Sequence, residues 1–245
     1  FIFALTRGLD AVRDLLHGAH QMDQHAFSLG VESNMALLAA WISVWERIGR
    51  GLTTTALIPY CQPLFQWTQH IQQLSCESNG KHFNQFNQPI SYPTAPMLFG
   101  STGTNAQHSF FQLIQQSKDI IPVQFIGFRH PAPHLPLSEE TQHNHTLLLN
   151  NLKAQQVALA KGKENDPHFQ GNRPSTLLLG NTLSPASLGA LFSFYENKTM
   201  YEGFLLNLNS FDQPGVQLGK EIALSFTHQE HQHDPLLKAL HHAYA

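Results

Sequence analysis

The chain contains few cysteines and few charged side chains. Only Cys61 and Cys76 occur among its 245 residues, which is too few for a disulfide framework, and they lack the CxxC spacing of a zinc site. We therefore expect reduced thiols in a cytoplasmic protein. Charged residues make up 13% of the chain and the formal net charge is -3, so no strong field favours nucleic acid or an anionic membrane surface as a partner.

Long apolar runs are missing as well. Gly, Pro or a charge interrupts every apolar stretch before it reaches the roughly 20 residues of a membrane helix. The chain does not begin with methionine, and its apolar start at Phe1 has neither the basic region nor the cleavage site of a signal peptide. We expect a soluble chain that has been processed or truncated. Its hydrophobic residues, 42% of the total, are enough to form a real core.

Apolar periodicity predicts the order of the elements. Helices are expected over residues 10–24 and 34–48, a short strand over 55–58, and a helix from Pro63 to about residue 75. Ser184-Pro185 and Asp234-Pro235 are typical of helix starts. Four strand and helix pairs then follow: 97–99 with a helix from 104, 120–128 with 141–161, 175–179 with 185–198, and 204–208 with 216–226. Such alternation predicts an α/β fold, a parallel sheet covered by helices.

Ligands of an open parallel sheet gather at the carboxyl ends of its strands, here after Phe99 and after Leu208. If residues 104–115 form one helix, Phe110, Leu113 and Ile114 share its core face and His108 lies on the opposite, polar face. A histidine in that position is usually only solvated. Spacing alone therefore does not make His108 a functional residue.

Two further charged residues are candidates. Glu77 follows a predicted helix and has the features of an ordinary surface carboxylate. Lys220 lies in the first turns of the helix after residues 214–215, where the helix dipole opposes a positive charge and favours proton exchange. The alternative for Lys220 is a lysine whose stem lies along the surface.

Several separate segments together resemble the glucose-6-phosphate isomerase family, over nearly the whole chain. Residues 18–25 are similar to its GAHxMDxH stretch and residues 57–60 to its LPY turn. Residues 77–81 match ESNGK, 103–108 match GTNxQH, 171–174 match GNRP, and 211–220 match FDQxGVxxxK. Because these blocks occur in the family's order, they are far more specific together than singly.

The resemblance implies a fold, an assembly and a set of roles. The fold would be a three-layer parallel-sheet sandwich of SIS type, with residues 1–50 a helical segment continuing from a preceding SIS domain, 51–228 the SIS domain and 229–245 a helical tail. Glu77 would be the base that moves a proton between C2 and C1 of the open-chain sugar through a cis-enediol. His108, supplied by the partner subunit of a homodimer, would open the sugar ring with help from Lys220. Gln73 and Gln213 would contact the substrate, and neither a metal nor an organic cofactor is expected.

Departures from the family pattern also have consequences. Ser101-Thr102 stands where most relatives have Glu-Pro, and Gln115 replaces a further histidine. The family's phosphate loop and the arginine of its GGR motif would lie before Phe1. Since that arginine is thought to stabilise the enediolate, the chain alone is expected to be inactive or nearly so.

Two other interpretations are open. The chain could be a sugar-phosphate-binding SIS module without catalysis, although a pure sensor needs no base such as Glu77. Alternatively, histidines near the end could bind a metal, but their spacing is loose and no Cys or carboxylate pattern fixes a tetrahedral geometry. The histidines concerned are His228, His231, His233, His241 and His242.

Overall fold

A computed structural model describes residues 2–28, 30–133, 138–227 and 234–244. The chain divides into two compact units, Phe1–Ser210 and Phe211–Ala245, and each is described by itself. The predicted boundaries at residues 50 and 228 stay predictions.

A four-stranded parallel sheet forms the centre of the first unit. Its strands are β1 (Thr54–Pro59), β2 (Met97–Phe99), β3 (Val123–Phe128) and β4 (Ser175–Gly180), in the order β2-β1-β3-β4. Ala56 fixes the register of three strands, because it pairs with Phe99 on one side and with Val123 on the other. The predicted parallel sheet is confirmed, and residues 55–58 lie within β1, one of its two inner strands.

The strand predicted over residues 204–208 is wrong. Helix α8 (Pro185–Leu205) continues through the first two of these residues, and a turn follows in which the Leu208 N–H donates to the Gly203 carbonyl. Leu206 and Leu208 are buried although both follow a helix end, so a short apolar run there indicated burial without indicating a strand.

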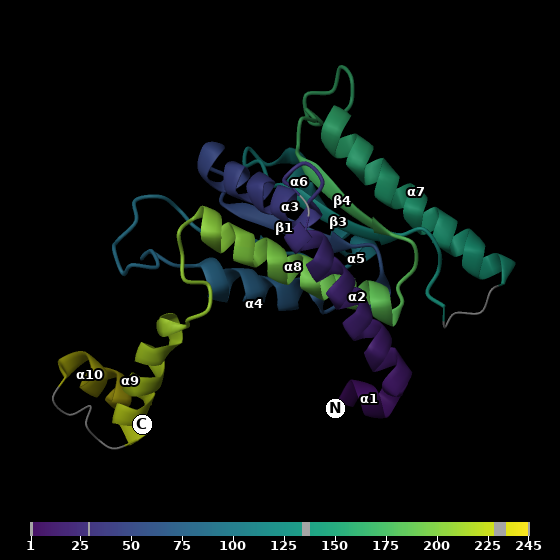
Figure 1. The fold of residues 1–245 in the computed structure, drawn as a ribbon. Helices are drawn as coiled ribbons and strands as arrows, with labels where there is room; N and C mark the ends of the chain where they lie inside the picture. Colours follow the sequence, from purple (N-terminus) through teal and green to yellow (C-terminus); the bar gives the residue numbers. More distant parts are fainter. Residues whose placement is uncertain (1, 29, 134–137, 228–233, 245) are drawn as a thin grey trace. The chain divides into compact units, whose positions relative to one another are not determined.

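Helices cover both faces of the sheet and produce three layers. Helices α5 (Gly103–Gln107), α6 (Phe111–Gln116) and α7 (Glu139–Lys161) lie on one face, over Ala56, Ile58 and Phe125. Helices α3 (Met35–Val44), α4 (Trp67–Asn79) and α8 lie on the other, over Leu57 and Ile126. Figure 1 shows α3 and α8 crossing in front of the strands, with α7 away from them on the other side. Because both faces are covered, β1 and β3 are nearly continuous apolar runs.

The amino-terminal helices belong to the same unit. After α1 (Ile2–Arg7), α2 (Leu9–Ser28) packs along α8, and α3 ends in a π-helical turn, η1 (Trp45–Gly49). A Cβ atom on Gly18 would lie 1.9 Å from the carbonyl oxygen of Ala186, so the close approach of α2 and α8 requires glycine there. The helices predicted over residues 10–24 and 34–48 are confirmed.

Two helices near the candidate site differ from the prediction. Pro63 lies in a short 3-10 turn, η2 (Gln62–Leu64), and α4 begins only at Trp67. The single helix expected from residue 104 is broken, because the N–H groups of His108 and Ser109 bond back three residues to Asn105 and Ala106. This break rotates the second half of the segment. Phe111 and Ile114 therefore form the core face, while Leu113, expected in it, is half exposed.

The second unit consists of η3 (Pro214–Val216), α9 (Gln217–Thr227) and α10 (Pro235–Tyr244). The Asp234 carboxylate accepts hydrogen bonds from the N–H groups of Leu236 and Leu237, at 2.8 and 3.1 Å, so the predicted cap is confirmed. At the start of α8, Ser184 and Ser187 form a reciprocal capping box, which confirms the other predicted helix start.

Candidate active site

Helix α4 carries Gln73 and Glu77 one turn apart. The Gln73 side-chain amide donates to Glu77 Oε2 at 3.1 Å, so the two side chains lie together on the accessible side of the helix. Glu77 itself is half-buried. The structure therefore brings together the predicted base and one predicted substrate contact.

Contacts along α4 show which edge of the sheet Glu77 occupies. Thr68 donates to the Leu57 carbonyl in β1, Gln72 donates to the Leu98 carbonyl in β2, and the Cys76 thiol lies 4.0 Å from the carbonyl of Pro96, the residue before β2. The helix thus runs antiparallel to the strands. Glu77 lies at the amino-terminal edge of the sheet and not at the carboxyl edge where ligands were expected.

His108 lies on the other side of the sheet. It is exposed at the end of α5, and its neighbour Gln107 donates to the Tyr60 hydroxyl at 2.9 Å. Burial raises the pKa of Tyr60 to about 12, although the bond from Gln107 acts in the opposite direction. Since α5 and α4 pack on opposite faces, one chain does not bring His108 and Glu77 together.

Gln213 and Lys220 belong to the second unit. Gln213 is exposed just before η3, and Lys220 is exposed in the first turns of α9, where the sequence predicted it. Both are thus accessible to solvent, and their place beside Glu77 stays a prediction.

The family-like stretch at residues 18–25 holds helices together. Asp23 accepts hydrogen bonds from the Ser193 hydroxyl at 2.6 Å and from the Asn197 amide at 2.9 Å, both in α8. The N–H of Met35, first residue of α3, donates to the imidazole of His25 at 3.0 Å. These contacts give Asp23 and His25 a structural role, because they hold α2 against α8 and α3.

The GNRP segment is also structural. Gly171 and Asn172 adopt positive φ values of 68° and 53°, and they lead into the buried Arg173. Its guanidinium donates to the Asp119 carbonyl at 2.8 Å and to the Ser117 carbonyl, which lie in the connection between α6 and β3. Arg173 thereby fixes the entries to two neighbouring strands.

A buried group of charges lies beside α4 and was not found from the sequence. Lys198 and Glu202 form an ion pair within α8, with side chains 9% and 5% exposed. Glu46 is buried as well, and burial raises its pKa although Lys198 and Arg50 act in the opposite direction. The spacing of Lys198 and Glu202, four residues apart on one helix, was the available sequence signal.

Metal binding finds no support in the part of the chain that is described, where no group of three or more His, Cys, Asp or Glu side chains could hold an ion. His228, His231 and His233 lie outside the described residues, and His241 and His242 lie in the last turn of α10. Both cysteines are free, and burial raises the pKa of Cys61 to about 11.

Among the described helices, none has the length and apolar character to cross a membrane.

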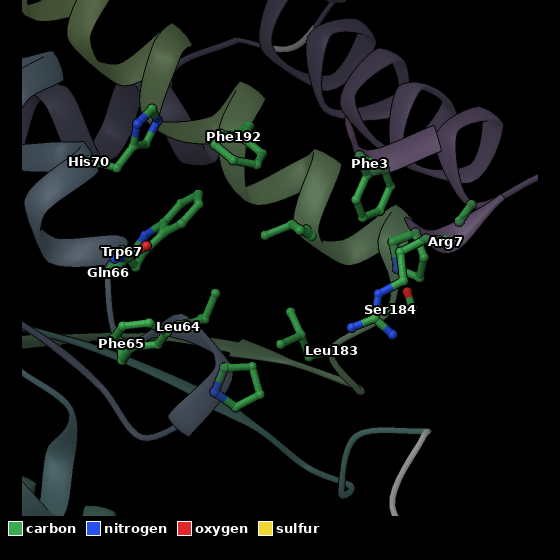
Figure 2. A pocket seen from close by; sticks show the side chains of 14 residues that line it. Phe3, Arg7, Leu64, Phe65, Gln66, Trp67, His70, Leu183, Ser184 and Phe192 are labelled. Atoms are coloured by element: carbon green, nitrogen blue, oxygen red, sulfur yellow. The ribbon is translucent and has the colours of Figure 1, made fainter. Parts of the chain in front are cut away.

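A cavity of about 510 Å³ opens elsewhere in the first unit. Figure 2 shows Trp67, His70 and Phe192 on one side of it and Phe3 and Arg7 on the other. The residues that line it include none of Gln73, Glu77 and His108. This cavity is therefore separate from the candidate site.

Comparison with known proteins identifies relatives over nearly the whole chain. Residues 1–240 match the family model described as phosphoglucose isomerase. The chain is 46% identical over 225 residues to the glucose-6-phosphate isomerase of Treponema denticola, a match that covers 91% of this chain and 43% of the relative. The enzyme of the same name from Chlamydia trachomatis serovar D is 44% identical over 219 residues. The chain thus spans less than half the length of these curated relatives.

Solved structures agree in fold. A crystal structure of glucose-6-phosphate isomerase from Chlamydia trachomatis superposes with a TM-score of 0.92 at 40% identity, over 99% of this chain and 47% of that one. A protein of Thermus thermophilus, TT0462, gives a TM-score of 0.68 at 21% identity, which supports the fold alone. The predicted fold class, an α/β parallel-sheet sandwich of three layers with flanking helices, is confirmed.

Proposed function

Because the chain belongs to the phosphoglucose isomerase family, we propose that it is the C-terminal part of an enzyme that interconverts glucose 6-phosphate and fructose 6-phosphate. Its relatives at 42–46% identity are named glucose-6-phosphate isomerase. Both free thiols support a cytoplasmic location. No metal or organic cofactor takes part in the proposed reaction.

Glu77 is the base in this proposal. Its carboxylate takes the proton from C2 of the open-chain aldose while the carbonyl oxygen at C1 gains a proton, which leaves a cis-enediol. The same carboxyl group then returns its proton to C1 while the C2 hydroxyl releases its proton and becomes the carbonyl, so the proton gained at the C1 oxygen is balanced by the one lost from the C2 oxygen. The single observation that carries this role is the placement of Glu77 on the accessible side of the last turn of α4, where Gln73 holds one of its oxygens.

His108 comes from a second copy of the chain. The opposite positions of α4 and α5 across the sheet support this, since one chain separates His108 from Glu77 by the sheet and the helix layers on it. A homodimer related by a two-fold axis would place each His108 at the partner's site. There it promotes ring opening with Lys220, while Gln213 contacts the substrate.

This chain alone is proposed to have little activity. It spans 43% of the Treponema denticola enzyme. In this proposal the phosphate loop and the GGR arginine belong to the remaining part. Without them the phosphate and the charge that develops on the enediolate lack their partners. The complete protein is therefore the right sample for every kinetic test.

The test is Glu77→Gln in the complete protein. Turnover should fall by about 10²-fold to 10⁴-fold, because glutamine cannot accept the C2 proton, while glucose 6-phosphate still binds. The matched control is Glu196→Gln, at an exposed position of α8, which should leave turnover unchanged. Coupled-enzyme kinetics and calorimetric titration measure the two quantities.

Two results would go against the proposal. If Glu77→Gln retains full turnover, another group is the base. If the unaltered complete protein binds sugar phosphate without converting it, the chain belongs to a non-catalytic SIS module, the alternative function.

A further inference from the structure

Asn79 occupies the inner side of the helix turn that carries Glu77. The two residues are two positions apart, which places their side chains about 200° apart around the helix axis. Glu77 is half-buried and keeps part of its side chain accessible, whereas Asn79 is 1% exposed. The last turn of α4 thus presents its carboxylate outward and buries an amide behind it.

The buried amide of Asn79 joins three segments. Its Nδ2 donates to the Thr199 carbonyl at 2.9 Å and to Glu202 Oε2 at 3.4 Å, both in α8. Its Oδ1 accepts a hydrogen bond of 2.6 Å from the hydroxyl of Ser210, the last residue of the first unit. The end of α4 is therefore attached both to α8 and to the point where the chain enters the second unit.

The partners of Asn79 are themselves held rigidly. Glu202 is fixed by its buried ion pair with Lys198, which leaves Oε2 free to accept from Asn79. Two residues beyond Asn79, the Lys81 ammonium donates to the carbonyl of Asn209, next to Ser210. The segment 77–81 is thus attached to residues 209–210 at two points.

This arrangement goes beyond what packing of α4 needs. Trp67 and Ile71 already bury the helix against the sheet and α8. The last turn of a helix has carbonyl groups without intrahelical partners and tends to fray, so a reacting group placed there requires separate support. Asn79 supplies it at the inner side of that turn.

We propose that Asn79 is a positioning residue for the isomerisation: its buried amide fixes the orientation of the Glu77 carboxylate and the point at which the segment carrying Gln213 and Lys220 begins. The inference rests on the proposed function, in which Glu77 is the base. Asn79 is accessible neither to substrate nor to solvent and takes part in no proton transfer.

The first variants are Asn79→Ala and Asn79→Asp in the complete protein. Aspartate has the size of asparagine and can accept from Ser210, but it cannot donate to Thr199 and it repels Glu202. Both variants should lower kcat by about 10-fold to 100-fold, since small displacements of a reacting group have such effects, while KM changes little. Asn144→Ala, at an exposed position of α7, is the matched control and should change neither.

Two measurements distinguish a positioning role of Asn79 from a merely structural one. With glucose 6-phosphate deuterated at C2, a displaced Glu77 should carry less deuterium to C1 and lose more to solvent. A variant that is only less stable should not show this change, because its folded molecules would transfer deuterium as the wild type does. The double variant Asn79→Asp with Glu202→Gln exchanges amide and carboxylate across the contact. The kcat of this double variant should be at least several-fold higher than the kcat of Asn79→Asp alone.

The outcomes distinguish the inference from the function on which it rests. If Glu77→Gln is inactive while Asn79→Ala keeps wild-type kcat and deuterium transfer, the positioning role is overturned and the proposed base stands. If Glu77→Gln is fully active, the proposed function fails first. Should Asn79→Ala not fold, Ser210→Ala removes a single bond to Asn79 and replaces it as the test: unchanged deuterium transfer there overturns the inference.

Discussion

One buried carboxylate contributes to the pH dependence of the stability of this protein. Glu46 is 8% exposed, and it faces Lys198 and Arg50. Their charges favour its ionised form, but loss of hydration is the larger effect and leaves the pKa raised above the ordinary value of 4.5. The folded protein therefore binds the Glu46 proton more tightly than the unfolded chain does. This contribution to stability is complete below pH 4.5 and is lost as the pH rises through the raised folded value.

Replacing Glu46 by glutamine removes that pH dependence. The melting temperature of Glu46→Gln minus that of the wild type should be more positive at pH 7 than at pH 4, because only the wild type bears the cost of ionisation at neutral pH. Calorimetry at both pH values measures this difference. Glu196→Gln, at an exposed position of α8, should show no such trend. A difference that becomes more negative as the pH rises would mean that attraction to Lys198 and Arg50 exceeds the cost of burial.

Residue identity alone could not reveal which members of a motif do chemistry. Within residues 77–81, Glu77 is accessible and Asn79 is buried, yet both are polar and both follow the same helical segment. Their different surroundings come from α8 and Ser210, more than one hundred residues later in the chain. Arg173 is similar, because its carbonyl partners lie in a connection that no local pattern specifies.

At the scale of elements, local patterns predicted the helices and strands that are long or capped. Ser184-Pro185 and Asp234-Pro235 start helices as expected, since a cap needs only neighbouring residues. The sequence could not show that the apolar run at 204–208 continues α8 into a turn, because a short apolar run has no period. The break at His108–Ser109 was missed for a similar reason, as bonds of 3-10 type leave little trace in composition.

The crossing of α2 and α8 gives a prediction about an element pair. A Cβ atom on Gly189 would lie 1.9 Å from the Leu15 carbonyl oxygen. Gly189→Ala should therefore force the helices apart and lower the free energy of unfolding by about 1–3 kcal/mol, as overpacking does. Urea denaturation measures the effect.

Gly219→Ala is the matched control, because nothing lies within 4 Å of a Cβ atom at that helical position. It should be neutral or stabilise by up to about 1 kcal/mol, the helix preference of alanine over glycine. If Gly189→Ala proved as neutral or stabilising as Gly219→Ala, the close approach of α2 and α8 would not govern this position.

In the whole molecule, two of the proposed catalytic residues, Glu77 and His108, lie on opposite sides of the sheet of the first unit. The order of the elements predicts a parallel sheet, and topology then puts α4 and α5 on opposite faces. Sequence reasoning placed ligands at the carboxyl edge, but Glu77 lies at the other edge, because it ends a helix that returns along the strands. A site assembled from two copies accommodates both positions. It requires that each Glu77 act with the His108 of the other copy and not with the His108 of its own chain.

Subunit mixing tests this requirement. Glu77→Gln and His108→Ala homodimers of the complete protein should each be nearly inactive. In a mixed dimer, one site combines the intact Glu77 of one chain with the intact His108 of the other, and the second site has both substitutions. Random exchange makes half of all dimers mixed, so about a quarter of wild-type turnover should return after unfolding and refolding the two variants together. If Glu77 and His108 acted within one chain, every site would carry one defect and refolding together would restore nothing.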